Sequence, residues 1–157
     1  MGAAERVRSY YDALRSGDPL GPFFAPDDEA VKFGISERLV GHEAIAEGLR
    51  AQTETTRDWY VESQDLRVTE RDCHAWFSDV VSLGWADTDK QIRYEFETRW
   101  SGTLERRASE QSDVSTGSER PSAPQPASDK PSAADPGADA NGQWQFVGMH
   151  VSTASDL

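Results

Sequence analysis

The chain has 157 residues, of which 28 are acidic and 16 are basic, so its formal net charge is −12. This length suffices for one domain with a modest hydrophobic core. The acidic balance argues against a nucleic-acid partner, since phosphate binding needs a basic stripe, and no apolar run reaches the roughly 18 residues of a membrane-spanning helix.

The cysteine and histidine residues indicate neither a disulfide nor a metal centre. Cys73 is the only cysteine, so no intrachain disulfide can form. His42, His74 and His150 fall in three different predicted elements without paired spacing, and no cofactor motif is present. We therefore expect no metal and no cofactor.

The first residues lack a signal-peptide core, which makes a cytoplasmic location the expectation.

The first predicted element is a helix over residues 4–16. Its apolar side chains recur at helical spacing, and Gly17 follows as a stop signal. Three prolines then break residues 18–27, which allows a turn or a short helix at most. Residues 31–35 predict a short strand.

A second helix is predicted to follow Gly41. Ile45 and Leu49 would lie on its buried side. Two longer strands are predicted after this helix, near residues 59–69 and 73–86, because both stretches are rich in aromatic and branched side chains.

The clearest strand signal lies in residues 91–105, where apolar and polar side chains alternate. The larger or less polar set comprises Ile92, Tyr94, Phe96, Thr98 and Trp100. A period of two residues is typical of a half-buried antiparallel strand.

Residues 108–141 differ in composition from the rest of the chain. Serine, alanine, proline, aspartate and glycine dominate there, and no residue is aromatic. Such a segment cannot bury enough apolar surface to offset its ordering entropy, so we expect a disordered acidic insertion. Residues 142–152 are again rich in large apolar side chains and predict the last strand, which gives one domain over residues 4–107 plus 142–153.

Four short motifs, in this order along the chain, resemble the NTF2-like superfamily and in particular its SnoaL-like and DUF4440-like members. They are Gly41-His42-Glu43-Ala44-Ile45, Ala75-Trp76-Phe77, Arg99-Trp100-Ser101-Gly102-Thr103-Leu104, and Trp144 with His150 and Ser152. The resemblance implies an α+β cone, in which a strongly curved antiparallel sheet wraps around N-terminal helices and leaves a cavity.

Glu97-Thr98-Arg99 and the last strand also resemble the association domain of calcium/calmodulin-dependent protein kinase II, a ring-forming member of this fold. That resemblance implies that Arg99 points into the cavity and can anchor a carboxylate. Two other cavity arginines of that domain have no counterpart, since Val151 replaces one, and Val80 and Val81 lie near the place of the other.

The basic residues are unusual because only three of them are lysines, Lys32, Lys90 and Lys130. A lysine-poor acidic composition resembles that of proteins from halophilic archaea. It implies a chain whose self-repulsion is relieved by screening in concentrated salt.

The pairing of the last two strands decides which side chains face the cavity. With Trp144 opposite Leu104, Arg99 lies opposite Met149 and points inward, while His150 lies on the other face. We favour this register, although a slip by one residue would exchange the faces. It stacks Trp100, Trp144, Phe146 and Phe96 on the outer face, and such an apolar patch predicts a homodimer.

The candidate ligand-pocket residues are Arg99, Asp79, Tyr11, Trp59 and Met149. Asp79 falls mid-strand among apolar side chains, where burial would suit it to general-base work; it is equally suited to pair with Arg99. Tyr11, or its neighbour Tyr10, could donate a hydrogen bond in the cavity, although both suit the core. His150 and Trp144 are structural residues or secondary site candidates.

Three functions follow from these residues. The first is a small-molecule-binding domain, with Arg99 as the anchor for a small carboxylate or an apolar carbonyl compound. The second is an enzyme resembling ketosteroid isomerases or polyketide cyclases, in which Asp79 is the base and Tyr10 or Tyr11 stabilises an enolate. The third is a non-catalytic dimeric interaction module, which a cavity filled by Trp59, Trp76 and Met149 would favour.

Overall fold

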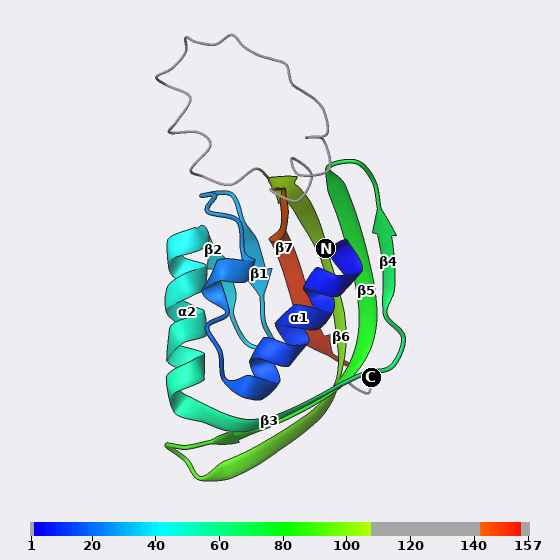
Figure 1. Ribbon diagram of the computed structural model, residues 1–157. Helices are drawn as coiled ribbons and strands as arrows, with labels where there is room; N and C mark the ends of the chain where they lie inside the picture. Colours follow the sequence, from blue (N-terminus) through cyan, green and yellow to red (C-terminus); the bar gives the residue numbers. More distant parts are fainter. Residues whose placement is uncertain (1, 108–141, 155–157) are drawn as a thin grey trace, which may run out of the picture.

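The computed structural model describes residues 2–107 and 142–154 as two helices and a curved seven-stranded sheet. In chain order the elements are α1 (Ala3–Ser16), the short 3₁₀ helix η1 (Gly21–Phe23), β1 (Val31–Phe33), β2 (Arg38–Val40), α2 (His42–Thr55), β3 (Thr56–Ser63), β4 (Arg67–Glu70), β5 (His74–Asp87), β6 (Ile92–Arg107) and β7 (Gln143–Thr153). Figure 1 shows the sheet curling around α1, with α2 at one side. The α+β cone expected from the sequence is confirmed.

The strands follow the order β2-β1-β7-β6-β5-β3, and β4 also pairs with β5. All neighbouring pairs are antiparallel except β1 and β7, which run parallel. The last predicted strand therefore lies inside the sheet, between β1 and β6.

Both predicted helices form at the expected places. The first ends at Gly17, whose φ of 76° is the left-handed conformation that glycine adopts without strain. The second begins after Gly41, where φ is 93°, and it buries Ile45 and Leu49. The apolar stripe of α1 is buried against the concave face of the sheet, and this places Tyr10 and Tyr11 in the core.

One strand prediction needs correction, and one strand was missed. The single strand expected near 59–69 is two strands, β3 and β4, because the chain turns between them while both pair with the longer β5. The turn is fixed by Gln64 and Asp65, whose backbone N–H groups donate to the Val80 carbonyl and the Asp79 carboxylate. Strand β2 was not predicted.

The favoured register of β6 and β7 is wrong. Leu104 pairs with Phe146 and not with Trp144, and Thr103 pairs with Gly148. Val147 is thus one extra residue on β7, which makes a β-bulge. The bulge resets the alternation of β7, so that Phe146 and Met149, three residues apart, both lie on the inner face.

The aromatic residues assigned to the outer face form the core instead. Trp100, Trp144 and Phe146 are all buried. The Tyr10 ring meets Phe146 at 5.4 Å and Trp100 at 6.1 Å, both edge to face. The apolar outer patch that was the argument for a homodimer is therefore not made by these residues.

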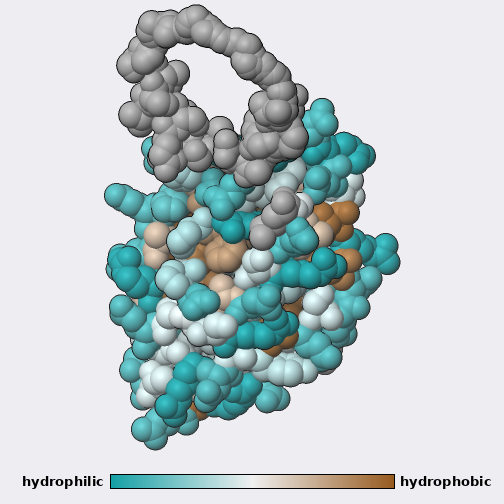
Figure 2. All heavy atoms as spheres, in the orientation of Figure 1, coloured by the Kyte–Doolittle hydropathy of each residue, from teal (hydrophilic) through white to brown (hydrophobic). Residues whose placement is uncertain are grey.

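The face of the molecule seen in Figure 2 is dominated by hydrophilic side chains, with apolar ones gathered in a few places. In the described part of the chain, neither helix is long and apolar enough to cross a membrane. The insertion predicted at 108–141 lies outside the described residues.

Candidate ligand cavity

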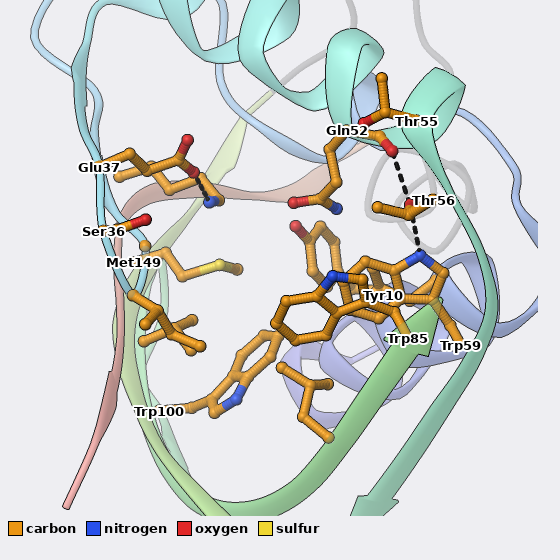
Figure 3. Close-up of a pocket in the computed structure, with 16 residues that line it drawn as sticks. Tyr10, Ser36, Glu37, Gln52, Thr55, Thr56, Trp59, Trp85, Trp100 and Met149 are labelled. Atoms are coloured by element: carbon orange, nitrogen blue, oxygen red, sulfur yellow. Dashed lines mark hydrogen bonds and ion pairs between the residues drawn. The ribbon is translucent and has the colours of Figure 1, made fainter. Parts of the chain in front are cut away.

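A cavity of about 260 Å³ lies between the concave side of the sheet, α1 and the end of α2 (Figure 3). Its apolar wall includes Trp59, Trp85, Trp100 and Met149. Its polar groups include Tyr10, Lys32, Glu37 and Gln52. The cavity is therefore open and not filled by its own tryptophans, and it combines a flat aromatic surface with a small number of hydrogen-bonding groups, as ligand pockets commonly do.

The aromatic wall depends on an irregularity in β3. The register of β3 against β5 shifts between Arg57 and Tyr60, and Asp58 has a φ of 55°. Trp59 lies within this irregularity and stacks on Trp85, with ring centroids 4.8 Å apart and planes 21° apart. Its indole N–H donates to the Thr56 hydroxyl at 2.8 Å, which fixes the ring. The stacked pair offers a planar apolar surface to a ligand ring.

A buried lysine supplies the positive charge of the cavity. Lys32 lies on β1, and its side chain is 6% exposed. Its Nζ donates to Glu37 Oε2 at 2.7 Å, while the Glu37 side chain remains 38% exposed. An ammonium group carries three N–H donors, so the ion pair leaves two of them for a ligand.

The Tyr10 hydroxyl also points into the cavity (Figure 3). The residue is 2% exposed, yet within residues 2–107 and 142–154 its hydroxyl has no hydrogen-bond partner. Burial, reinforced by the charge of Glu37, raises the pKa of Tyr10 well above its ordinary value. The group therefore stays neutral and can both donate and accept a hydrogen bond.

Gln52 adds a fourth polar group. Its amide extends from α2 into the cavity in Figure 3, opposite the aromatic wall. No side-chain partner for this amide is found among the described residues. Tyr10, Gln52 and the spare donors of Lys32 thus give the cavity several hydrogen-bonding groups that the protein itself does not use.

Asp79 and Tyr11 are brought together, but they do not line the cavity. Asp79 is 4% exposed and accepts hydrogen bonds from the Tyr11 hydroxyl at 2.8 Å, the Ser63 hydroxyl at 2.6 Å and the Asp65 N–H at 3.0 Å. Burial and the hydrogen bond to Asp79 raise the pKa of Tyr11. This network joins α1 to the β3–β4 turn, so its geometry is that of a structural tie.

The prediction that Arg99 points into the cavity is wrong. Arg99 is exposed on the outer face of β6, where it lies opposite Val80 and Ser152. The neighbouring Trp100 takes the inward position, because alternate residues of a strand face opposite sides. Arg99 also makes no ion pair with Asp79, whose carboxylate the Tyr11 network occupies.

The other candidates occupy three different environments. Trp59 and Met149 line the cavity. His150 lies exposed on the outer face, as the sequence suggested, and its ring packs on Phe33 at 5.4 Å. Trp144 is buried in the core, and the guanidinium carbon Cζ of Arg106 lies over its ring, 5.8 Å from the ring centroid. Within the described ranges, no three histidine, cysteine or acidic side chains cluster as metal ligands.

Sequence reasoning missed Lys32, Glu37 and Gln52. One signal was available for Lys32. In a short strand its side chain points to the face opposite Val31 and Phe33, so a lysine at this position can point toward the core. Glu37 lies in a turn between two short strands and Gln52 in a polar run of α2, so neither position is distinguished by pattern.

Comparison with known proteins agrees with this architecture. The profile of the SnoaL-like domain family matches residues 4–110. No curated protein matches the chain.

Similar solved structures include a ketosteroid isomerase-like protein from Erwinia carotovora atroseptica, with 15% identity, a TM-score of 0.62 and coverage of 98% of this chain and 94% of that one. A candidate dehydratase of the NTF2-like family from Streptomyces avermitilis has 11% identity, a TM-score of 0.67 and coverage of 99% and 95%. A candidate calcium/calmodulin-dependent protein kinase II association domain from Xanthomonas campestris has 15% identity, a TM-score of 0.65 and coverage of 98% and 86%. At these identities the likeness concerns the fold alone. The family match covers most of the chain, and the chain therefore belongs to the SnoaL-like domain family.

Proposed function

We propose that this protein binds a small, largely aromatic molecule that carries a carbonyl or carboxylate oxygen. The observation that carries this proposal is the Tyr10 hydroxyl, which is buried, faces the cavity and has no partner among the described residues. A buried polar group without a partner costs roughly 1–3 kcal/mol, a cost that a ligand oxygen would remove.

The anchor of this ligand is Lys32 and not Arg99. Lys32 lines the cavity and has two N–H donors that its bond to Glu37 does not use, and the stacked pair Trp59 and Trp85 offers a flat surface for a ring. A ligand oxygen would then lie near Lys32 and Tyr10, with its apolar body against the tryptophans.

A proton-transfer enzyme is the second candidate, and one observation favours it. Glu37 is a carboxylate at the cavity, close to a buried ammonium group. Similar structures include an isomerase-like protein and a candidate dehydratase. In this alternative Glu37 takes the role first assigned to Asp79, because three donors already occupy the oxygens of Asp79.

We also propose a homodimer through the outer face of the sheet, on residues other than those first expected. Trp76, Val80 and Phe33 are exposed there, around a row of small side chains on β5 and β6. Light scattering after gel filtration, in high potassium chloride to suit the acidic composition, should give twice the monomer mass. Trp76→Ser should shift it toward the monomer, whereas a monomeric wild type would refute the dimer.

The ligand proposal can be tested by thermal shift and calorimetry with naphthyl methyl ketone and naphthoic acid. Tyr10→Phe removes only the hydroxyl, so it should weaken ketone binding by about 1 kcal/mol, roughly fivefold in the dissociation constant. The free protein should become no less stable, because the variant lacks the unpartnered buried hydroxyl. Arg99→Ala is the matched control on the outer face and should bind like the wild type. The proposal would be refuted if neither compound bound. It would also be refuted if Tyr10→Phe and Arg99→Ala changed the dissociation constant of the ketone equally.

A further inference from the structure

We propose that Lys32 is a nucleophile as well as an anchor, and that its Nζ condenses with the carbonyl carbon of an aromatic aldehyde or ketone to form an imine. The inference rests on the proposed ligand cavity. It goes further by assigning a covalent step to one side chain.

Lys32 is the only described lysine that a cavity ligand can meet. Of the three lysines in the sequence, Lys90 lies exposed in the β5–β6 turn, and Lys130 falls outside the described residues. Lys32 is 5% exposed overall, yet it lines the cavity. Its amine is therefore shielded from bulk water but accessible from inside. A compact amine on a flexible stem in such a setting is suited to imine chemistry.

Glu37 is placed to take the proton that the attack requires. An ammonium group is not a nucleophile, so Lys32 must first lose a proton, and Glu37 Oε2 lies 2.7 Å from its Nζ. Transfer within the pair leaves the buried amine of Lys32 neutral, which lowers the cost of keeping that amine out of water. The Glu37 side chain is partly exposed and can exchange its proton with solvent.

The step balances within the named groups. The nitrogen lone pair of Lys32 attacks the carbonyl carbon, and the C=O π electrons move to oxygen, which can accept a hydrogen bond from the Tyr10 hydroxyl. Transfer of one proton from this nitrogen to the alkoxide oxygen gives a neutral carbinolamine. The protonated carboxyl of Glu37 then gives its proton to the hydroxyl, water leaves, and the nitrogen lone pair forms C=N as a protonated imine beside the regenerated Glu37 carboxylate. The net change is one carbonyl and one ammonium group converted to one protonated imine and one water.

The aromatic wall would favour the product. A planar aryl imine can lie along the stacked Trp59 and Trp85, and Met149 and Val151 border the same space. Apolar side chains around the bond limit the access of water to the C=N carbon and slow its hydrolysis.

The competing explanation is that Lys32 and Glu37 form only a structural ion pair across the β1–β2 turn. Lys32→Arg separates the two explanations, since arginine keeps a positive charge and a donor for Glu37 but cannot form the imine under these conditions. The variant should fold as the wild type does, and circular dichroism would verify this.

The experiment is reductive trapping of the full chain with naphthaldehyde and sodium cyanoborohydride near neutral pH. Intact mass spectrometry would count the reduced adducts, and peptide mapping would locate them. We expect one early adduct on Lys32, formed at least about tenfold faster than on Lys90, because binding holds the carbonyl carbon beside the amine. Glu37→Gln should slow the Lys32 adduct, and Lys32→Arg should abolish the fast phase.

An adduct spread equally over Lys32, Lys90 and the N-terminal amine would overturn the inference, as would an unchanged fast phase in Lys32→Arg. Calorimetry with naphthyl methyl ketone separates this result from failure of the ligand proposal. Binding of the ketone without trapping of the aldehyde would refute only the imine, whereas no binding and no trapping would refute both.

Discussion

Replacing Tyr11 by phenylalanine tests whether the buried network around Asp79 is a structural tie. The substitution removes one hydroxyl and leaves the ring, which packs edge to face on Trp100 at 5.3 Å. Asp79 would keep two of its three donors, the Ser63 hydroxyl and the Asp65 N–H. The change therefore removes a hydrogen bond without making a large cavity.

At neutral pH the expected loss follows from that one bond. A hydrogen bond to a charged group contributes about 1.5–3 kcal/mol, so Tyr11→Phe should lower the free energy of unfolding by about 2 kcal/mol. The Tyr11 hydroxyl donates to a carboxylate that is 4% exposed, which places the expected value in this range and not near zero.

In alkali the difference between the two proteins should shrink. The pKa of Tyr11 is raised in the folded protein by burial and by Asp79, so the native state keeps the proton while the unfolded chain releases it above its ordinary value of 10.0. The stabilisation from this shift is complete below that pH and is lost as the pH rises further. One pH unit above 10.0, ionisation of Tyr11 in the unfolded chain should lower the free energy of unfolding of the wild type by about 1.4 kcal/mol. The phenylalanine variant has no such loss.

Urea unfolding monitored by tryptophan fluorescence at neutral pH and near pH 11 would measure both effects. Tyr60→Phe is the control, because Tyr60 is exposed on the other side of the sheet, and its bond to Glu62 should contribute little. Stability curves for wild type and Tyr11→Phe that stay parallel into alkali would refute the reasoning, as would a loss at neutral pH no larger than that of the control.

Two further substitutions test the packing at the β6–β7 bulge. Gly102→Ala would place a Cβ 2.5 Å from the Gly148 carbonyl oxygen and 2.7 Å from the Phe77 ring, so we expect a loss of about 1–3 kcal/mol by overpacking, measured by urea unfolding. Phe146→Ala would empty a fully buried site between Tyr10, Phe24 and Phe77, with an expected loss of about 3–5 kcal/mol in the same assay. A neutral result for either would mean that the bulge region repacks freely.

The element order could be predicted from the sequence, whereas the direction of Arg99 was predicted wrongly. Residues 92–100 alternate, and burial along this strand follows the alternation: Trp100 and Thr98 are buried, Tyr94 and Phe96 are half-buried, and only Ile92 at the strand end is exposed. The kinase resemblance suggested the opposite face for Arg99. Here the local pattern was the better guide, because burying Trp100 is favourable, and burying an arginine without a partner is not.

The register of β7 could not be predicted, because nothing local fixes it. Val147 and Gly148 carry no strong bulge signal, and the segment joining β6 to β7 is too long to set the pairing. The cavity chemistry was missed for a related reason: Lys32 and Glu37 meet across a turn between two three-residue strands. Contacts of that kind follow from tertiary geometry and not from periodicity.

The polar and the apolar lining of the cavity lie on different parts of the sheet, and this has an evolutionary consequence. The ion pair lies on the β1–β2 hairpin at the edge of the sheet, whereas Trp100 and Met149 belong to its central strands. Edge residues can change with little effect on the buried centre, so mutations within residues 31–40 could alter ligand preference while the scaffold is inherited intact. Divergence of specificity among descendants of such a protein should begin at that hairpin.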